Sequence, residues 1–347
     1  MMARAIKTVL VRAPNWLGDA VMSLPFFASL RATLPEATIL CLCRANLTSL
    51  FESVTAIDRV IPMDESRGRS GLAAVRLNAT RIRSENADCA FSLPSSFGSA
   101  LMLWLARIPL RAGHAAEGRG LLLTDSLSYG KNGNRPHRAE GYLALLPLVL
   151  PDARFVRDLV FTPGANAAHD ADALWSKSAI TKPLLALGPS AAQPNKMWAP
   201  ERFAELGRRW IDEFSGTVIL VGSPAEHDYA ERIKAQLKLD KVLNLAGAGN
   251  IAVAAEILRR ADVFVGNDSG LVHLAAAVGT RTVAVSGPGD PREVSPFSPL
   301  AVTVKRPLFC SPCYQNTCWR KDKPLECLTA IEVDQVWQQV VAFAAYW

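Results

Sequence analysis

Two kinds of hydrophobic pattern alternate along the chain, and together they predict an α/β protein. Short continuous apolar runs predict strands at residues 6–11, 38–42, 90–93, 184–187, 217–221, 242–245, 262–265 and 282–285. Apolar side chains spaced every three to four positions predict helices at residues 19–33, 66–85, 200–214, 225–239 and 332–346. Strands that alternate with helices in this way are typical of parallel sheets covered by helices.

A change in composition predicts the boundary between two domains. The chain runs through Pro163 and Gly164 into a polar, alanine-rich passage. We therefore expect domains at residues 1–165 and 166–347, each long enough for its own core, with the last helix able to pack back on the first domain. Two α/β domains of this size predict a ligand cleft between them.

The positive charge of the chain is concentrated in its first half. The chain has 38 Lys and Arg against 32 Asp and Glu, a net charge of +6. Up to Ala165 there are 19 basic and 13 acidic residues, and after it there are 19 of each. The excess is densest between Arg59 and Arg83 and between Arg107 and Arg138. Such an excess suits a phosphorylated ligand, an anionic membrane or nucleic acid.

The sequence shows no pattern typical of export or of a membrane span. The first ten residues hold only a short apolar stretch, and the uncharged segment 89–106 contains Pro94 and Gly98. Seven cysteines, an odd number, are typical of a reducing compartment. We therefore expect a cytoplasmic protein.

The turn after the first predicted strand holds a candidate catalytic carboxylate. Gly18 permits a tight turn there, and Asp19 is a favoured N-cap for the helix that follows. The same carboxylate would lie at the carboxyl end of a strand, where parallel sheets bind ligands, and could take a proton from a hydroxyl group. The two roles are compatible, so the sequence leaves both open.

Two turns in the second half predict a phosphate site. Ser190 follows a strand and a glycine, and Lys196 comes six residues later, although an ordinary loop with a surface lysine fits the same spacing. After the strand at 262–265, Asp268 and Ser269 precede a helix whose free N–H groups suit a diphosphate and sugar hydroxyls. His273 lies one helical turn further on, as a packed residue or as part of the site.

Two other motifs receive little weight. Residues 247–252 match the dinucleotide pattern G-x-G-x-x-A, with Asp268 at about the expected ~20 residues further on. The strand before them is short and lies late in its domain, which argues against NAD. Asp170-Ala-Asp172 resembles a metal-binding pair, but it falls in the expected linker, and we interpret it as solvated charge.

Four cysteines near the end of the chain have two interpretations. Their spacing is C-x-x-C followed by gaps of four and eight residues, compact enough for four thiolates around a structural zinc ion. A reduced cysteine-rich loop is equally compatible, because the usual two-pair spacing is absent. The residues concerned are Cys310, Cys313, Cys318 and Cys327.

The motifs together resemble one known family. The segment from Ala13 to Pro25, which reads APNWLGDAVMSLP, looks like the N-terminal signature of the ADP-heptose lipopolysaccharide heptosyltransferases. Residues 187–198, 267–273 and 286–291 look like its C-terminal signatures, in the family's order. The Asn-Trp before Leu-Gly-Asp and the late cysteines look closer to heptosyltransferase II than to heptosyltransferase I.

The resemblance implies a GT-B arrangement, two Rossmann-like domains facing a central cleft, and an inverting transfer of heptose. Asp19 would be the catalytic base, Lys196 would steady the departing diphosphate, and Asp268 would hold heptose hydroxyls. Glu226 would bind the ribose and the backbone near Gly249 the adenine. The residues expected around the phosphates are Ser190, Ser269, Gly270 and His273.

For the other partner, the resemblance implies a lipid A–inner core acceptor on the first domain. We expect Arg59, Arg67 and Arg119 to bind it, with peripheral contact at an anionic membrane and at the cytoplasmic face of the inner membrane. No cofactor is expected to be required, and structural zinc is the one metal considered. The rival functions are a same-family transferase with another sugar, an NAD-dependent oxidoreductase and a zinc-bearing nucleic-acid module.

Overall fold

The computed structural model describes residues 6–65, 71–128, 130, 134–176 and 180–344. The chain separates into two compact units, Met1–Leu159 and Val160–Trp347, each built on one sheet. The division falls slightly before the boundary expected at residue 165. No helix in the described ranges is both long enough and apolar enough to span a bilayer.

The first unit holds a parallel sheet of six strands in the order β3-β2-β1-β4-β5-β6. Its central strands are buried because helices cover both faces. The strands are β1 (Thr8–Arg12), β2 (Thr38–Cys43), β3 (Arg59–Pro62), β4 (Cys89–Ser92), β5 (Leu110–Ala115) and β6 (Asp125–Ser128).

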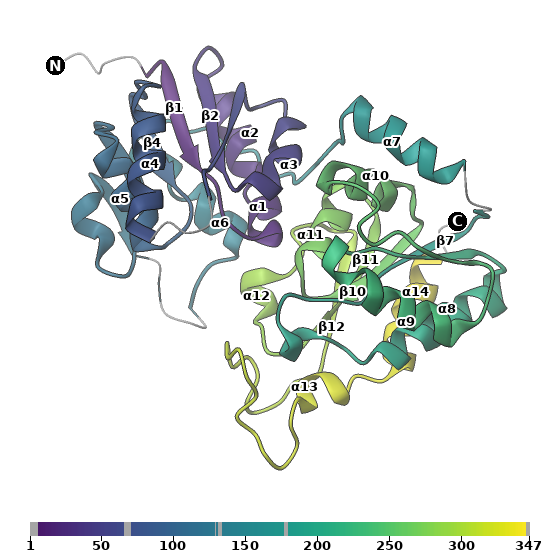
Figure 1. The fold of residues 1–347 in the computed structure, drawn as a ribbon. Coiled ribbons are helices and arrows are strands. Elements are labelled where there is room, and N and C mark those ends of the chain that lie inside the picture. Colours follow the sequence, from purple (N-terminus) through teal and green to yellow (C-terminus); the bar gives the residue numbers. More distant parts are fainter. Residues whose placement is uncertain (1–5, 66–70, 129, 131–133, 177–179, 345–347) are drawn as a thin grey trace. The chain divides into compact units, whose positions relative to one another are not determined.

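The helices of the first unit form a layer on each side of its sheet (Figure 1). Helices α4 and α5 lie side by side on one face, where Ile82 and Met102 pack against Leu10. On the other face, Phe26 of α2 meets Phe91 of β4 edge to face, with ring centroids 5.1 Å apart. The elements are α1 (Leu17–Met22), α2 (Leu24–Thr33), α3 (Thr48–Glu52), α4 (Gly71–Arg83), α5 (Phe97–Leu105) and α6 (Arg138–Leu143), with 3-10 turns η1 (Ala45–Leu47), η2 (Arg119–Leu122) and η3 (Leu146–Leu148).

The second unit repeats this plan with a parallel sheet in the order β12-β11-β10-β7-β8-β9. Each of its three central strands, β7, β10 and β11, is almost entirely buried. The strands are β7 (Leu184–Gly188), β8 (Thr217–Leu220), β9 (Val242–Asn244), β10 (Val263–Asn267), β11 (Arg281–Ser286) and β12 (Ala301–Lys305).

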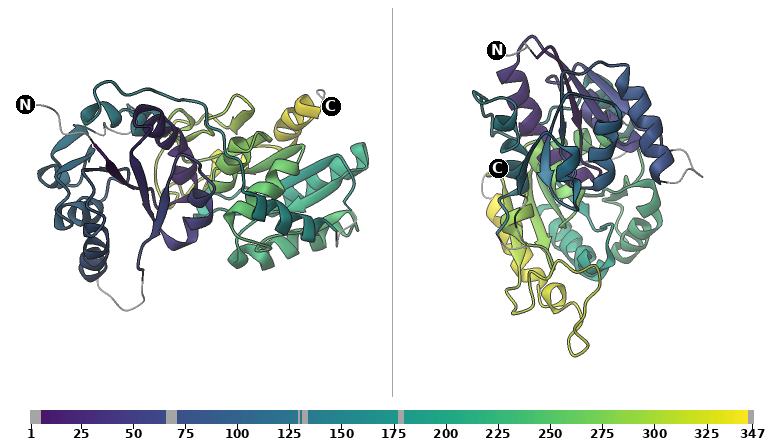
Figure 2. Two further views of the ribbon diagram at one scale, coloured as in Figure 1. Left: turned by 90° about the horizontal axis from the view of Figure 1, so that it is seen from above. Right: turned by 90° about the vertical axis from the view of Figure 1, so that its left-hand side faces the viewer.

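Helices again cover both faces of the second sheet. Trp198, Phe203 and Trp210 form a core with α8, α9 and α14 on one face, and α7 packs against α10 on the other (Figures 1 and 2). The elements are α7 (Ala165–Trp175), α8 (Pro200–Phe214), α9 (His227–Leu237), α10 (Ile251–Arg260), α11 (Gly270–Ala277), α12 (Pro291–Val294), α13 (Glu326–Thr329) and α14 (Val333–Ala344), with η4 (Pro194–Lys196) and η5 (Pro224–Glu226).

Both strand orders place a topological switch point at the middle of the sheet. In the first unit the chain winds outward in opposite directions from β1 and β4, and in the second from β7 and β10. Loops at the carboxyl ends of such strand pairs leave a crevice that binds ligands in open α/β sheets. The two switch points are therefore the places where the fold predicts chemistry.

Two sequence predictions need correction. The helix expected at 19–33 is two helices, because Ser23 ends α1 and Pro25, which lacks an N–H, lies in the first turn of α2. The expected linker contains α7, which belongs to the second unit. The last helix, α14, completes the core of the second unit, where Val336 and Val340 are buried.

Candidate active site

Asp19 lies just beyond β1, beside the switch point of the first unit. Trp16, not Asp19, is the N-cap of α1, so the capping role predicted for Asp19 is wrong. Asp19 instead occupies the first turn of α1, where the positive end of the helix dipole stabilises a carboxylate. Its side chain is 22% exposed, so the carboxylate is reachable from solvent.

The carboxylate of Asp19 lies beside a cation that no sequence motif indicated. Nη1 of Arg138, the first residue of α6, lies 3.7 Å from Oδ1 of Asp19. The α6 N-terminus is fixed by His137, whose Nδ1 accepts a hydrogen bond from the Ala139 N–H. Arg138 belonged to a basic stretch in the sequence, but only the fold brings it to Asp19.

The arginines predicted to bind the acceptor have different environments. Arg59 is exposed and forms an ion pair with Glu85, so it can reach a ligand only by leaving that partner. Arg67 lies outside the described residues. Arg119 is fully buried and cannot contact an acceptor, so that prediction is wrong.

Arg119 ties together the loops at the end of β4. Its Nε donates to the His114 carbonyl at 2.7 Å, and its Nη1 donates to the hydroxyl groups of Ser92 and Ser99 and to the carbonyls of Pro94 and Ser96. Burial lowers the pKa of Arg119 to about 10. The guanidinium therefore acts as an internal cross-link rather than as a binding group.

The switch point of the second unit brings Lys196 and Asp268 together. Lys196 ends η4 beyond β7, and Asp268 follows β10. Lys196 Nζ donates a hydrogen bond to Asp268 Oδ2 at 2.8 Å, and the Asp268 side chain is only 9% exposed. Ser190 is buried in the same loop that leads from β7 to η4. Three residues predicted from two separate turns thus belong to one switch point.

Asn267 holds these two loops in register, a role that the sequence analysis missed. Its Oδ1 accepts a hydrogen bond from the Trp198 N–H at 2.8 Å, and its Nδ2 donates to the Pro189 carbonyl at 2.7 Å. Asn267 is completely buried, so both bonds are shielded from water. The signal in the sequence was a polar residue at the end of a strand of otherwise buried residues.

The N-terminus of α11 adds backbone donors to this site. Ser269 is the N-cap, but its side chain makes no capping hydrogen bond, which leaves the hydroxyl available to a ligand. Gly270 begins the helix, whose first N–H groups have no intrahelical acceptors. His273 is 4% exposed, and it packs within the unit. His273 was expected either to pack in the core or to belong to the site, and its burial fits packing in the core.

Glu226 and Gly249 lie at the carboxyl ends of β8 and β9. Glu226 Oε2 accepts a hydrogen bond from the Ser223 N–H at 2.6 Å, which fixes the carboxylate and leaves other lone pairs for ribose hydroxyls. A Cβ on Gly249 would come within 2.6 Å of Val253, so the turn before α10 requires glycine. This turn follows the edge strand β9 and not the switch point, which is the wrong context for an NAD fingerprint.

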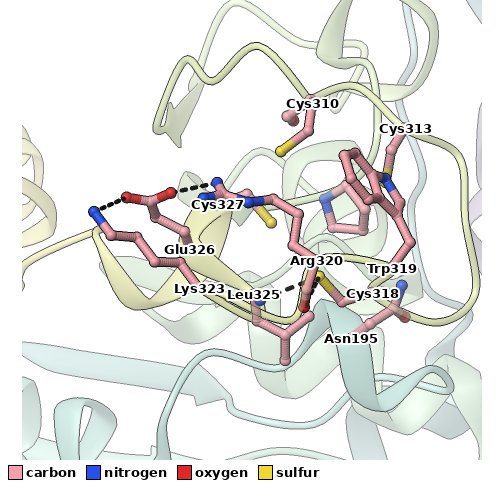
Figure 3. Close-up of a pocket in the computed structure, with 12 residues that line it drawn as sticks. Asn195, Cys310, Cys313, Cys318, Trp319, Arg320, Lys323, Leu325, Glu326 and Cys327 are labelled. Carbon is pink, nitrogen blue, oxygen red and sulfur yellow. Dashed lines mark hydrogen bonds and ion pairs between the residues drawn. The ribbon is translucent and has the colours of Figure 1, made fainter.

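The four late cysteines line one small cavity but are not placed as a metal-ligand set. The cavity has a volume of about 20 Å³, and Asn195 and Trp319 also line it (Figure 3). No three His, Cys, Asp or Glu side chains within the described ranges are arranged to hold a metal ion. Burial, followed by the neighbouring thiols, raises the pKa of Cys327 to about 11. Structural zinc therefore stays a prediction of the spacing alone.

Comparison with known proteins agrees with this architecture. A model of glycosyltransferase family 9 (heptosyltransferase) matches residues 75–323. Lipopolysaccharide heptosyltransferase 2 of Salmonella typhimurium is 30% identical over 306 residues, which cover 86% of this chain and 87% of that protein. The structure of E. coli ADP-heptose LPS heptosyltransferase II has a TM-score of 0.78 and 27% identity, covering 97% of this chain and 98% of that one. A glycosyltransferase family 9 structure from Veillonella parvula, 20% identical, shares the fold with a TM-score of 0.87 over 100% and 99% of the two chains.

Two parallel six-stranded sheets, each with candidate residues at its own switch point, match the structures of GT-B glycosyltransferases, as predicted. The chain belongs to glycosyltransferase family 9, the heptosyltransferases. The match spans most of the chain, and it favours neither the oxidoreductase nor the nucleic-acid module.

Proposed function

We propose that this protein transfers heptose from ADP-L-glycero-D-manno-heptose to the first heptose of the lipopolysaccharide inner core, with inversion at the anomeric carbon. The relatives named lipopolysaccharide heptosyltransferase 2 and ADP-heptose LPS heptosyltransferase II support both substrates. In this reaction an acceptor oxygen bonds to the anomeric carbon while the bond from that carbon to the diphosphate breaks. ADP leaves with the electron pair of the broken bond.

The acceptor hydroxyl must lose a proton as it attacks, and we assign that proton to Asp19. Its carboxylate is accessible and lies at the switch point of the first unit. Arg138, 3.7 Å away, keeps a positive charge beside this carboxylate. The same guanidinium is close enough to orient an anionic acceptor, and we give it that second role.

The departing diphosphate gains negative charge, and we assign its stabilisation to Lys196 and the N-terminus of α11. Lys196 is held by Asp268 rather than mobile in solvent, so it is preorganised for this charge. The hydroxyls of Ser190 and Ser269 and the first N–H groups of α11 supply further donors. These groups together supply the electrostatic stabilisation that the leaving ADP requires.

The rest of the donor is assigned by position. Asp268 binds heptose hydroxyls with the oxygen atoms that Lys196 leaves unused, and Glu226 binds the ribose. The backbone around Gly249, which has no room for a side chain, lies against adenine. Asp172 is engaged by Arg260 at 2.8 Å and plays no part in the proposal.

We assign the acceptor to the first unit because the whole positive excess of the chain lies there. Lipid A and the inner core carry phosphate and carboxylate groups that such a surface attracts. We place the protein at the cytoplasmic face of the inner membrane, in peripheral contact with anionic lipid.

The observation that carries the proposal is the Lys196–Asp268 pair at the β7–β10 switch point, in a chain of this family. Thermal unfolding with ADP, ADP-heptose or NAD tests the donor, because a ligand that binds the native state raises its stability. We expect stabilisation by ADP and ADP-heptose, and none by NAD. Stabilisation by NAD alone would contradict the proposed donor.

A further inference from the structure

Helix α5 presents an apolar face to solvent. Phe97, Leu101 and Trp104 are spaced four and three residues apart, so their side chains lie on one side of the helix. Phe97 is 44% exposed and Trp104 is 49% exposed. The helix FGSALMLWL contains no charged residue, whereas the outer face of a surface helix is ordinarily polar.

Neighbouring elements extend this apolar surface. Leu72, at the start of α4, is 47% exposed, and α4 packs beside α5 (Figure 1). Leu121 is 94% exposed on η2, which also packs against α5. Together with the three α5 side chains, these two leucines form what we call the α5 face. Several large apolar side chains on adjacent elements mark an interaction surface rather than scattered exposure.

The stretch of chain that holds α4 and α5 is rich in arginine. Residues 71–111 contain five arginines and two acidic residues, Glu85 and Asp88. Glu85 pairs with Arg59, and Asp88 accepts hydrogen bonds from the backbone N–H groups of Lys7 and Thr8. Five arginines against two carboxylates leave this stretch with a net positive charge.

Two of these arginines share a cavity at the end of the helices. Arg83, the last residue of α4, and Arg107, two residues beyond α5, both line a cavity of about 290 Å³. Asp88 lies in the same wall, where the backbone of β1 holds it. The cavity is large enough for a phosphate group, and both arginines belong to its wall. Glu117, 3.4 Å from the Phe97 N–H, lies at the opposite end of α5.

We propose that the α5 face docks on an anionic phospholipid bilayer. Trp and Phe side chains suit the boundary between headgroups and acyl chains, and the arginines of residues 71–111 suit lipid phosphates. Phe97 follows β4, the strand that pairs with β1. The docked face therefore begins near the carboxyl ends of these two strands, where Asp19 also lies. This inference rests on the proposed function, because a glycolipid acceptor would lie in the same bilayer.

Vesicle sedimentation tests this proposal without any substrate. The full chain is mixed with phosphatidylglycerol/phosphatidylcholine vesicles or with phosphatidylcholine vesicles alone. We expect binding to the anionic vesicles and a loss of at least tenfold in the partition coefficient for Phe97→Ser/Trp104→Ser. The matched control, Phe155→Ser/Trp319→Ser, removes one exposed phenylalanine and one exposed tryptophan elsewhere and should bind like wild type.

A second variant still tests the proposal if Phe97→Ser/Trp104→Ser, the apolar variant, does not fold. Arg83→Gln/Arg107→Gln should also lose binding to anionic vesicles, with native thermal stability. Equal binding of the wild type, the apolar variant and the arginine variant would overturn the proposal, as would equal binding to neutral vesicles. So would a change in oligomeric state with vesicle binding intact, which would identify a second copy as the occupant.

Failure of the docking proposal can be told apart from failure of the proposed function. Transfer to a delipidated, water-soluble inner-core saccharide depends on the active site and needs no bilayer. We expect this activity in Phe97→Ser/Trp104→Ser at the wild-type rate. Loss of vesicle binding with this activity retained is the result the α5 face predicts.

Discussion

Lys196 and Asp268 form an ion pair of 2.8 Å between two loops that lie 72 residues apart in the sequence. The pair lies where β7 and β10 meet, with Asn267 holding the same loops together through hydrogen bonds to Trp198 and Pro189. An ammonium group that is held in place needs little reorganisation when charge develops on a leaving diphosphate. The pair thus links the topology of the second unit to its chemistry.

Replacing Lys196 tests this link. We expect Lys196→Ala to lower kcat by about 100-fold or more, because a preorganised positive charge is lost from the transition state. The donor Kd should rise as well, measured by calorimetry with ADP. Lys196→Arg keeps the charge and is the control, with a smaller loss. Unchanged kinetics in the alanine variant would remove Lys196 from the mechanism.

Replacing Asp19 should lower the rate of transfer without changing the affinity for the donor. Asp19→Asn removes the proton acceptor with little change in shape, and we expect transfer to fall by about 10²- to 10⁴-fold. Affinity for ADP should stay at the wild-type value, since the donor is assigned to the other unit. Arg138→Gln should raise the acceptor KM with the ADP affinity unchanged. A near-normal rate in Asp19→Asn would mean that another group takes the proton.

Arg119 should be essential for stability rather than for binding. Arg119→Met leaves buried carbonyl and hydroxyl groups without their donor, and we expect the free energy of unfolding to fall by about 3 kcal/mol or more. Urea denaturation measures the loss. The exposed Arg76→Met, on α4, is the control and should change stability by about 0.5 kcal/mol at most. If stability is unchanged and only the acceptor KM rises, Arg119 contacts the acceptor after all.

The buried His114 should make the free energy of unfolding depend on pH. Burial lowers its pKa to about 4 from an ordinary 6.5, so the unfolded chain binds a proton between these values and the folded chain does not. Stability from this group is therefore complete above pH 6.5 and is lost as the pH falls toward 4, by up to about 3 kcal/mol.

The comparison of two histidine variants isolates this contribution from the carboxylates that also titrate there. Urea unfolding is measured at about pH 7 and about pH 4.5. His114→Gln should flatten the difference between the two, whereas His169→Gln, at an exposed position on α7, should keep the wild-type difference. The same pH dependence in all three proteins would show that His114 does not contribute.

Local patterns were enough to predict eight of the twelve strands in the described residues and several helices, whereas β3, β5, β6 and β12 were not predicted. The strands around Leu10 and Val265 were predicted because a strand buried on both faces reads as a continuous apolar run. The break at Ser23 was missed because apolar periodicity continues across it, while the cause is the missing N–H of Pro25. Helix α7 was taken for a linker because its alanine-rich sequence has only a narrow apolar face, with Ala167 and Ala171 buried.

The sequence predicted several residues of the site, but it did not predict which side chains contact one another. Motifs identified Asp19, Lys196 and Asp268, because strand ends followed by helix starts are visible in a sequence. The contact between Arg138 and Asp19 depends on how α6 packs near α1, which no local pattern encodes. Arg119 was assigned to the surface because arginine is seldom fully buried, and only the folded loops around it satisfy its guanidinium.

The most direct test of the proposed function is mass spectrometry of an inner-core acceptor carrying one heptose after incubation with the protein and ADP-heptose. We predict a product heavier by one heptose, formed by the wild type and by Phe155→Ser/Trp319→Ser but not by Asp19→Asn. A product obtained only with a different sugar nucleotide, or an acceptor that stays unmodified under all conditions, would contradict heptose transfer to this acceptor.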